Sequence, residues 1–158
     1  MSGQFIIKKA GDKGNGLFTT QSYPKGTIIL KFEGTTIVRT DIKDFSGQAA
    51  SCLLQIGSEL YLDLKGDFSF FANHSCNPNT GIKVVANNAF LISIQDIKSG
   101  DELSYDYSTT STEDNSTFIL NCNCSKFKCR KLISGFDTLT QEQKQKYIDL
   151  GVVPKYLL

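Results

Sequence analysis

The sequence has no long apolar run, no excess of either charge and only one histidine. Because 18 consecutive apolar residues are absent, a transmembrane helix is not expected, and the N-terminus lacks the charged and apolar regions of a secretory signal. The 17 basic residues balance 16 acidic ones, which leaves a formal net charge of +1. Nucleic-acid-binding domains carry a basic excess, so direct nucleic-acid binding is not expected. We therefore expect a soluble intracellular protein without membrane contact, in the nucleus or the cytoplasm.

Many short apolar or β-branched stretches, separated by turns rich in glycine and asparagine, predict a mainly-β fold. The length of 158 residues suits one domain with a real core. Thr-Gln-Glu-Gln at 140–143 is a capping-box pattern and predicts one helix over about 140–150. Asn87-Asn88 predicts a hairpin turn, residues 40–52 are ambiguous, and the polar residues 108–117 are typical of a solvated connector. The expected strands cover residues 5–9, 17–20, 27–32, 53–56, 60–64, 82–85, 89–94 and 102–107.

Five cysteines in an intracellular chain favour a metal or chemistry over disulfides. Cys122, Cys124 and Cys129 lie within eight residues, which is too close for convenient disulfide pairing among themselves. Three thiolates and one further ligand complete a tetrahedral zinc site. The spacing alone predicts zinc and leaves the fourth ligand open.

The segment Phe71-Ala72-Asn73-His74-Ser75-Cys76-Asn77-Pro78-Asn79 holds the only histidine. A loop of this kind offers many polar contacts and little packing, and a lone histidine in it is more often structural than catalytic. The segment resembles the signature of the SET-domain protein-lysine methyltransferases, Asn-His-Ser-Cys-x-Pro-Asn, and all six fixed positions match. Further motifs follow in the family's order, so the resemblance covers roughly residues 5 to 135.

Three of these further motifs are less specific when they are taken singly. Lys13-Gly14-Asn15-Gly16 is alone a glycine turn, but it resembles the family's first motif, which implies backbone contacts to S-adenosylmethionine. Phe32-Glu33-Gly34 resembles the second motif, usually Tyr-x-Gly. Residues 102–107, Glu-Leu-Ser-Tyr-Asp-Tyr, alternate as a strand with packing tyrosines, and they resemble the fourth motif.

Several positions depart from the family pattern, and four of them support a non-catalytic SET-like module. Asn15 replaces a frequent aromatic residue, and Phe32 has no hydroxyl where tyrosine is usual. Cys52 stands where many members have a tyrosine, and we expect it to be a small buried apolar residue. Phe70 replaces an arginine, which is the largest departure and is typical of a reduced SET domain.

The resemblance implies a fold of small curved β-sheets with a pseudoknot, in which the 73–79 segment is tucked beneath the 102–107 segment. It divides the chain into a SET domain at 1–117, a post-SET cysteine-rich tail at 118–135 and a C-terminal helical extension at 136–158. It also supplies the missing zinc ligand, Cys76, beside Cys122, Cys124 and Cys129, and leaves Cys52 as the odd cysteine. Residues 130–132 of the tail then fold over the cofactor.

The resemblance assigns site roles residue by residue. Tyr107 orients the reacting groups through its hydroxyl, and Tyr105 is the switch that limits the product to monomethyl-lysine. The substrate channel is lined by Phe32, Leu54 and Tyr105. The expected cofactor-binding residues are Lys13, Gly14, Asn15, Gly16, Asn73, His74 and Leu132.

Methyl transfer requires a neutral lysine amine, although the free pKa of lysine is near 10.4. Deprotonation at neutral pH costs about 4 kcal/mol, and an apolar channel and the nearby sulfonium lower that cost. The expected partner is a histone or non-histone protein substrate, bound by a monomeric enzyme. Two other hypotheses stay open: a non-catalytic SET-like binding module, and a zinc-stabilised scaffold or nucleic-acid binder.

Overall fold

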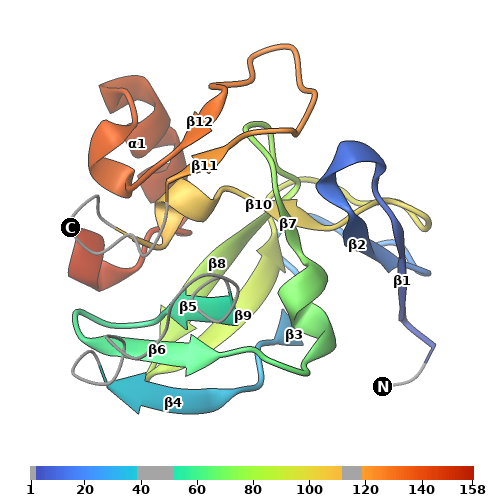
Figure 1. The fold of residues 1–158 in the computed structure, drawn as a ribbon, viewed down its shortest axis with the longest axis horizontal. Coiled ribbons are helices and arrows are strands. Elements are labelled where there is room, and N and C mark those ends of the chain that lie inside the picture. Colours follow the sequence, from blue (N-terminus) through green and yellow to red (C-terminus); the bar gives the residue numbers. More distant parts are fainter. Residues whose placement is uncertain (1–2, 39–51, 112–118) are drawn as a thin grey trace.

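Short strands make up most of the regular structure in residues 3–38, 52–111 and 119–158, the part of the chain that the computed structural model describes (Figure 1). One α-helix lies near the C-terminus, so the mainly-β prediction is confirmed. The strands are β1 (Phe5–Lys9), β2 (Asn15–Thr19), β3 (Ile28–Lys31), β4 (Thr35–Val38), β5 (Leu53–Gln55), β6 (Leu60–Asp63), β7 (Asn73–His74), β8 (Thr80–Val85), β9 (Asn88–Ser93), β10 (Ser104–Tyr105), β11 (Leu120–Asn121) and β12 (Leu132–Ile133). The helices are α1 (Gln141–Asp149) and the short 3-10 turns η1 (Gly11–Lys13), η4 (Phe68–Phe71), η5 (Tyr107–Thr109), η6 (Phe136–Thr138) and η7 (Lys155–Leu157).

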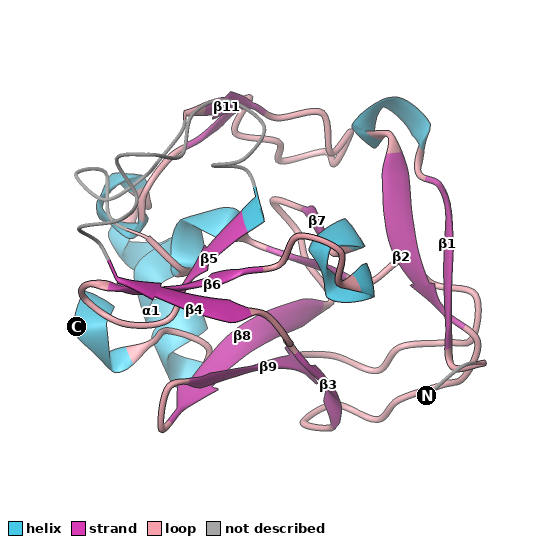
Figure 2. Cartoon of the chain, turned by 60° about the horizontal axis from the view of Figure 1, so that its bottom comes forward, coloured by secondary structure: helices cyan, strands magenta, loops and turns pink. Residues whose placement is uncertain are grey.

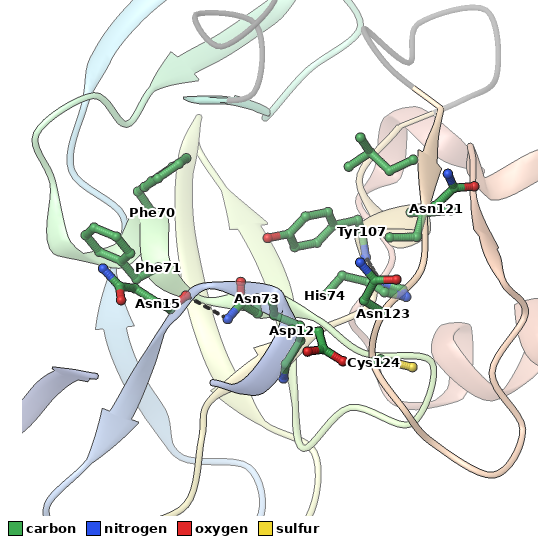
Figure 3. A pocket seen from close by; sticks show the side chains of 13 residues that line it. Asp12, Asn15, Phe70, Phe71, Asn73, His74, Tyr107, Asn121, Asn123 and Cys124 are labelled. Carbon is green, nitrogen blue, oxygen red and sulfur yellow. Dashed lines mark hydrogen bonds between the residues drawn. The ribbon is translucent and has the colours of Figure 1, made fainter. Parts of the chain in front are cut away.

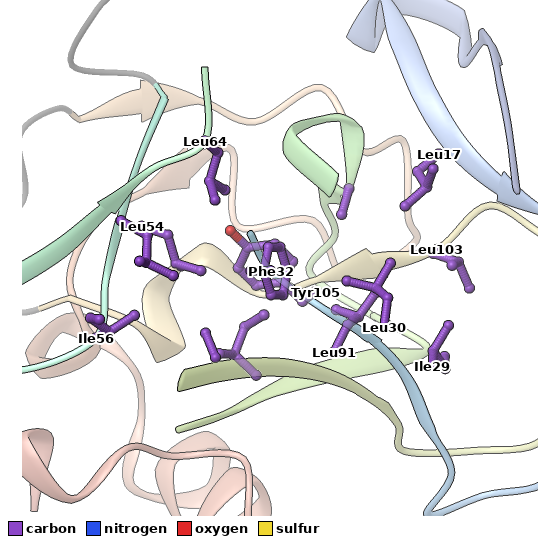
Figure 4. Close-up of a cluster of buried hydrophobic side chains, with 14 of the residues drawn as sticks. Leu17, Ile29, Leu30, Phe32, Leu54, Ile56, Leu64, Leu91, Leu103 and Tyr105 are labelled. Carbon is purple, nitrogen blue, oxygen red and sulfur yellow. The ribbon is translucent and has the colours of Figure 1, made fainter. Parts of the chain in front are cut away.

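Two three-stranded antiparallel sheets, β3-β9-β8 and β4-β6-β5, form the middle of the molecule (Figure 2). β1 and β2 form a separate antiparallel ribbon, as do β11 and β12. The largest apolar core contains residues from both three-stranded sheets and from β10, and Figure 4 shows Phe32 and Tyr105 at its centre. Its apolar side chains supply most of the free energy that holds the small sheets together.

The β8–β9 hairpin forms as the sequence predicts, but its turn is shifted by one residue. Ala86 and Asn87 have positive φ angles of 47° and 62°, which a two-residue hairpin turn of type I′ requires at both places. The Asn88 side-chain amide donates to the Ala86 carbonyl at 2.9 Å and supports the turn. The hairpin is confirmed, and its turn lies one residue before the expected Asn87-Asn88.

The C-terminal helix begins with the expected capping box. Gln143 N–H donates to the Thr140 hydroxyl at 3.2 Å, and Thr140 N–H donates to the Gln143 side-chain oxygen at 3.0 Å. Both contacts satisfy amide groups that have no partner inside the helix. Gly151, with a φ of +66°, follows the end of the helix.

The strand expected over residues 102–107 is shorter than predicted, because only Ser104–Tyr105 pair as a strand. Asp106 accepts a hydrogen bond from Ser108 N–H at 3.1 Å and starts η5, so Tyr107 lies on a helical turn rather than in a strand. β4, β11 and β12 were not predicted. Residues 40–51 of the ambiguous segment and 112–117 of the expected connector lie outside the described residues.

The central segment and the 102–107 segment lie side by side, as the resemblance implies. β7 pairs with β10 in parallel, with Asn73 opposite Ser104 and His74 opposite Tyr105. The Asn79 side chain extends this contact, because it donates to Glu102 O at 2.8 Å and accepts from Ser104 N–H at 3.0 Å. In the described part of the chain, no helix has the length and apolar character needed to cross a membrane.

Candidate functional site

A pocket of about 410 Å³ lies between the β1–β2 turn, the central segment and the cysteine-rich tail (Figure 3). Figure 3 shows Asn15, Phe70 and Phe71 on one side and Tyr107, Asn121 and Asn123 on the other. Five of the residues expected to bind the cofactor or act in catalysis line it: Lys13, Asn15, Asn73, His74 and Tyr107. The other lining residues are Asp12, Phe70, Phe71, Leu120, Asn121, Asn123, Cys124 and Ile133, and sequence reasoning gave none of them a place there.

A charged hydrogen-bond network fixes the floor of this pocket. Lys13 Nζ lies 2.5 Å from one carboxylate oxygen of Glu102, and the Asn73 amide donates to the other at 2.9 Å. The Asn73 amide also donates to the Asn15 carbonyl at 3.0 Å, as the dashed line in Figure 3 shows. Both Asn73 N–H groups are therefore used within the protein, and its side-chain oxygen remains for a ligand donor. The sequence pattern placed Glu102 in a motif without a role, and the structure makes it the anchor of this network.

Gly14 and Gly16 are required for two different reasons. Gly14 has a φ of +82° and open space where a side chain would start, so its backbone conformation requires glycine. A Cβ at Gly16 would lie 2.7 Å from Glu102 Oε1 and 2.9 Å from Asn73 Nδ2. Gly16 thus lets the network on the pocket floor come close to the β2 backbone, and neither glycine lines the pocket itself.

His74 is buried beneath the pocket and joins it to the cysteine cluster. Its Nδ1 accepts from Tyr107 N–H at 3.2 Å, and its Nε2 lies 3.3 Å from Cys76 Sγ. Burial lowers the pKa of His74 to about 4, although the Asp106 carboxylate at 3.5 Å opposes this. The imidazole is therefore neutral at pH 7, with its proton on Nε2 and directed at the Cys76 sulfur. In this state it orients neighbouring groups and carries no charge.

The thiols of Cys76, Cys122, Cys124 and Cys129 all lie within 4.8 Å of one another, and the Cys76 and Cys122 sulfurs are 3.6 Å apart. A tetrahedral zinc site with Zn–S bonds of about 2.3 Å needs sulfurs about 3.8 Å apart. Arg130 N–H and Lys131 N–H each approach a sulfur at 3.4 Å, which suits thiolate ligands. The four residues fit zinc in number, chemistry and spacing. Cys52 is half-buried, less than expected, and is not a member of this cluster.

A buried carboxylate, Asp106, ties the tail and the C-terminal helix to the site. The Arg130 guanidinium donates to both Asp106 oxygens at 2.7 Å, and the Tyr147 hydroxyl of α1 donates to one of them at 2.9 Å. Asp106 is 1% exposed, so these groups replace water around its charge. The tail was expected to fold over the cofactor, but the Arg130 side chain is directed inward to this carboxylate. Leu132 is half-exposed on β12, and its neighbour Ile133 lines the pocket.

The residues expected to form the substrate channel lie together next to the pocket. Phe32 is 1% exposed and Leu54 is 2% exposed in the core cluster that also holds Tyr105. The Phe32 and Tyr105 rings meet edge to face with centroids 6.4 Å apart, and the Tyr105 and Tyr107 centroids are 4.8 Å apart. An aromatic series therefore leads from the pocket into the core, with Tyr107 as its first member.

Both tyrosine hydroxyls stay protonated at neutral pH. Burial raises the pKa of Tyr107 above its usual range, and the Glu102 carboxylate adds to this effect. Burial also raises the pKa of Tyr105, which lies near the phenols of Tyr107 and Tyr156. The Tyr107 hydroxyl donates to the Ala72 carbonyl at 3.0 Å and is directed toward the pocket in Figure 3. It is a hydrogen-bonding group and not a base.

Comparison with known proteins places this geometry in context. The SET domain family profile matches residues 14–108, more than half of the chain. Among curated relatives, the chain is 26% identical over 133 residues to "Histone-lysine N-methyltransferase trithorax" of Drosophila virilis. This match covers 77% of this chain and 3% of the relative. The chain is 30% identical over 131 residues to human "Histone-lysine N-methyltransferase 2D", covering 75% of this chain and 2% of the relative. The chain therefore spans only a small part of these relatives.

The fold also has a close match among solved structures. The crystal structure of KRYPTONITE in complex with mCHG DNA and SAH superposes with a TM-score of 0.65 at 24% sequence identity. The match covers 82% of this chain and 28% of the other. At this level of identity the likeness shows the fold, and it confirms the architecture that the sequence motifs implied.

Proposed function

This chain belongs to the SET-domain family, and on that premise we propose that it transfers a methyl group from S-adenosylmethionine to the side-chain amine of a protein lysine. The observation that carries the proposal is the position of Tyr107, at the boundary between the polar pocket and the buried aromatic cluster. Cofactor and substrate amine must meet at one point, and this is the point where the two regions touch. The curated relatives named histone-lysine methyltransferases support the same reaction.

The pocket supplies the groups that a nucleoside with an amino-acid tail requires. When bound, S-adenosylmethionine supplies an electrophilic methyl group on a sulfonium. The side-chain oxygen of Asn73 and the backbone beside Asn15 would offer hydrogen-bond partners for its polar groups, and Lys13, which is paired with Glu102, would offer a cation to its carboxylate. Leu120 and Ile133 provide apolar walls on the side of the tail. The expectation that Leu132 covers the adenine of the bound cofactor stays a prediction.

The channel residues act on the substrate amine. Deprotonation of the lysine ammonium costs about 4 kcal/mol at neutral pH, because the lysine pKa lies near 10.4. The walls formed by Phe32, Leu54 and Tyr105 are apolar and dry, which favours the uncharged form. Because Tyr107 stays protonated, its hydroxyl would hydrogen-bond the substrate amine and orient it toward a bound cofactor, and this orientation would supply much of the rate.

The cysteine cluster holds a structural zinc ion in this proposal. Cys76 comes from the central segment and the other three thiols from the tail, so the metal fixes the tail against the pocket. The metal takes no part in the methyl transfer itself.

The substrate class follows from the relatives, and a histone tail is the first substrate to test. A non-histone lysine remains the alternative, and the monomeric state stays a prediction. A histone substrate would place the protein with chromatin in the nucleus.

The decisive experiment measures cofactor binding and turnover separately. Calorimetry with S-adenosylmethionine should show saturable binding at one site, and labelled cofactor should mark a lysine in core histones or in whole lysate. Binding without transfer to any substrate would favour a non-catalytic SET-like module, which the departures at Phe32 and Phe70 suit. No binding to zinc-loaded protein would refute the proposal.

The product is expected to be monomethyl-lysine, because the Tyr105 hydroxyl takes space that a second methyl needs. Tyr105 is buried beside Phe32, which has no hydroxyl of its own to add to this restriction. Mass spectrometry on a single-lysine peptide should find one methyl with the natural chain and two or three with Tyr105→Phe. Rapid trimethylation by the natural chain would contradict this assignment.

A further inference from the structure

The short turn η7 of the C-terminal extension carries a tyrosine whose hydroxyl contacts two separate elements. Tyr156 Oη, from η7, lies 2.8 Å from the Gln55 carbonyl of β5 and 2.8 Å from the Thr110 carbonyl that follows η5. A phenol has one proton, so the two carbonyls share a single donor. The hydroxyl thereby holds the end of β5 against the end of η5.

Each of these elements carries a residue of the proposed site. Leu54, a channel residue, directly precedes Gln55 in β5. Thr110 donates to the Tyr107 carbonyl from its N–H at 3.2 Å and from its hydroxyl at 3.0 Å, so its position depends on Tyr107. Tyr156 is therefore linked to Leu54 through one peptide bond, and to Tyr107 through the hydrogen bonds that Thr110 donates.

Two contacts of the C-terminal extension hold the segment that carries Tyr156 in place. Val152 is fully buried against Gly81 of β8, where a Cβ would lie 2.5 Å from the Val152 side chain. Tyr147 is anchored to Asp106 at 2.9 Å. The segment from α1 to η7 is therefore attached at three separated points, and it lies beyond residue 108, where the match to the SET profile ends.

Gln55 adds a second sign that this junction is under constraint. Its side chain is buried, and its amide donates to the Gly57 carbonyl at 2.9 Å. Its Oε1 has no hydrogen-bond partner among the residues that the structure describes. A buried acceptor without a donor costs free energy, so β5 is held here against a local penalty. The contact from Tyr156 to the Gln55 backbone opposes that penalty.

We propose that Tyr156 is a positioning residue for methyl transfer, which fixes the distance between Leu54 and Tyr107 and so the width of the channel. The inference rests on the function proposed above. Tyr156 does not line the cofactor pocket, so its loss should affect the alignment of the amine and not the affinity for the cofactor. A looser channel should also admit an amine that already carries a methyl group.

Tyr156→Phe tests the inference, because it keeps the ring and removes only the shared donor. We expect kcat to fall about five-fold or more, the scale of one lost hydrogen bond in a part-buried position. Cofactor affinity by calorimetry should stay within about two-fold. The single-lysine peptide, which receives one methyl from the natural chain, should receive a second.

Tyr23→Phe is the matched control. Tyr23 is buried, whereas Tyr156 is half-buried, and the Tyr23 hydroxyl accepts from the Gln21 side chain at 2.7 Å. Among the described residues, this hydrogen bond involves no residue of the site. We expect Tyr23→Phe to keep the kcat and the product of the natural chain. If Tyr156→Phe keeps both, or if both variants lose kcat equally with their stability, the inference is overturned. A natural chain that binds cofactor and methylates nothing would instead overturn the proposed function, and this inference with it.

Discussion

At the scale of single residues, Asp106 and Arg130 form a buried ion pair that joins the tail to the site. The Asp106 side chain is fully buried, whereas the Arg130 side chain keeps a minor part of its surface in water. The charge of the pair is shared with Tyr147 and Ser108 N–H. Removal of one partner from a buried ion pair is costly because the other charge remains without water.

Arg130→Met should therefore lower the free energy of unfolding by about 3 kcal/mol or more. Arg130→Lys keeps the charge but loses the two parallel hydrogen bonds. Its free energy of unfolding should therefore lie between those of Arg130→Met and the natural chain. Urea unfolding at a fixed free zinc concentration measures both. A loss below about 0.5 kcal/mol for Arg130→Met would show that the pair contributes nothing net.

Tyr107→Phe should remove most of the turnover and leave cofactor affinity nearly unchanged, because the hydroxyl acts on the reacting groups. The loss of its bond to Ala72 should cost about 1 kcal/mol of stability. Burial raises the pKa of Tyr107, so the phenol does not ionise in the working range and cannot act as the base. The rate should then rise with pH as the substrate ammonium loses its proton. The slope should be the same for the natural chain and for Tyr107→Phe. A flatter profile for Tyr107→Phe would make Tyr107 the base.

At the scale of elements, the β1–β2 turn shows two glycines with separate tasks. Gly16→Ala should push Glu102 and Asn73 apart, because the new Cβ would lie within 3 Å of both side chains. We expect a loss of about 1–3 kcal/mol in stability and a weaker cofactor complex. Gly14→Ala has open space and should cost about 1–3 kcal/mol through its backbone conformation alone, with less effect on the cofactor. Equal cofactor affinities in calorimetry would contradict this division.

The elements also show what a sequence can and cannot predict. Repeated short apolar stretches and the Thr140 capping box depend on neighbours in the chain, so they predicted the strands and the helix. Spacing predicted the three thiols of the tail, and only the family resemblance supplied Cys76, since it lies 46 residues from Cys122. The partners of Asp106 and the shared donor Tyr156 were missed. Both arise from segments that meet only in the folded chain, and no local pattern reports them.

At the scale of the whole molecule, the expected zinc site joins the central segment, the tail and, through Arg130, the C-terminal helix. The expected boundary between residues 117 and 118 lies outside the described residues, so the division into three segments stays a prediction.

A chelator that removes zinc should release the tail and leave the β3-β9-β8 sheet intact. Apparent binding energies of structural zinc reach about 10–16 kcal/mol, well above what the two-residue strands β11 and β12 can supply. Hydrogen exchange should show lost protection over 119–133 and retained protection over β8 and β9. Elemental analysis should find one zinc per chain, and Cys76→Ser should reduce it. Zinc-free reduced protein with an ordered tail would contradict the metal assignment.

The position of Cys76 also constrains the order in which the chain is assembled. Metal held by Cys76 and Cys122 turns residues 76–122 into a closed ring that contains β10, while β7, which must pair with β10, lies just outside it. During synthesis Cys122 emerges after β7 and β10, so the β7–β10 pair has time to form before the ring can close. Refolding from denaturant loses this order. Zinc present from the start can close the ring around an unpaired strand, so a better recovery of active protein is expected when the metal is added after the chain has collapsed.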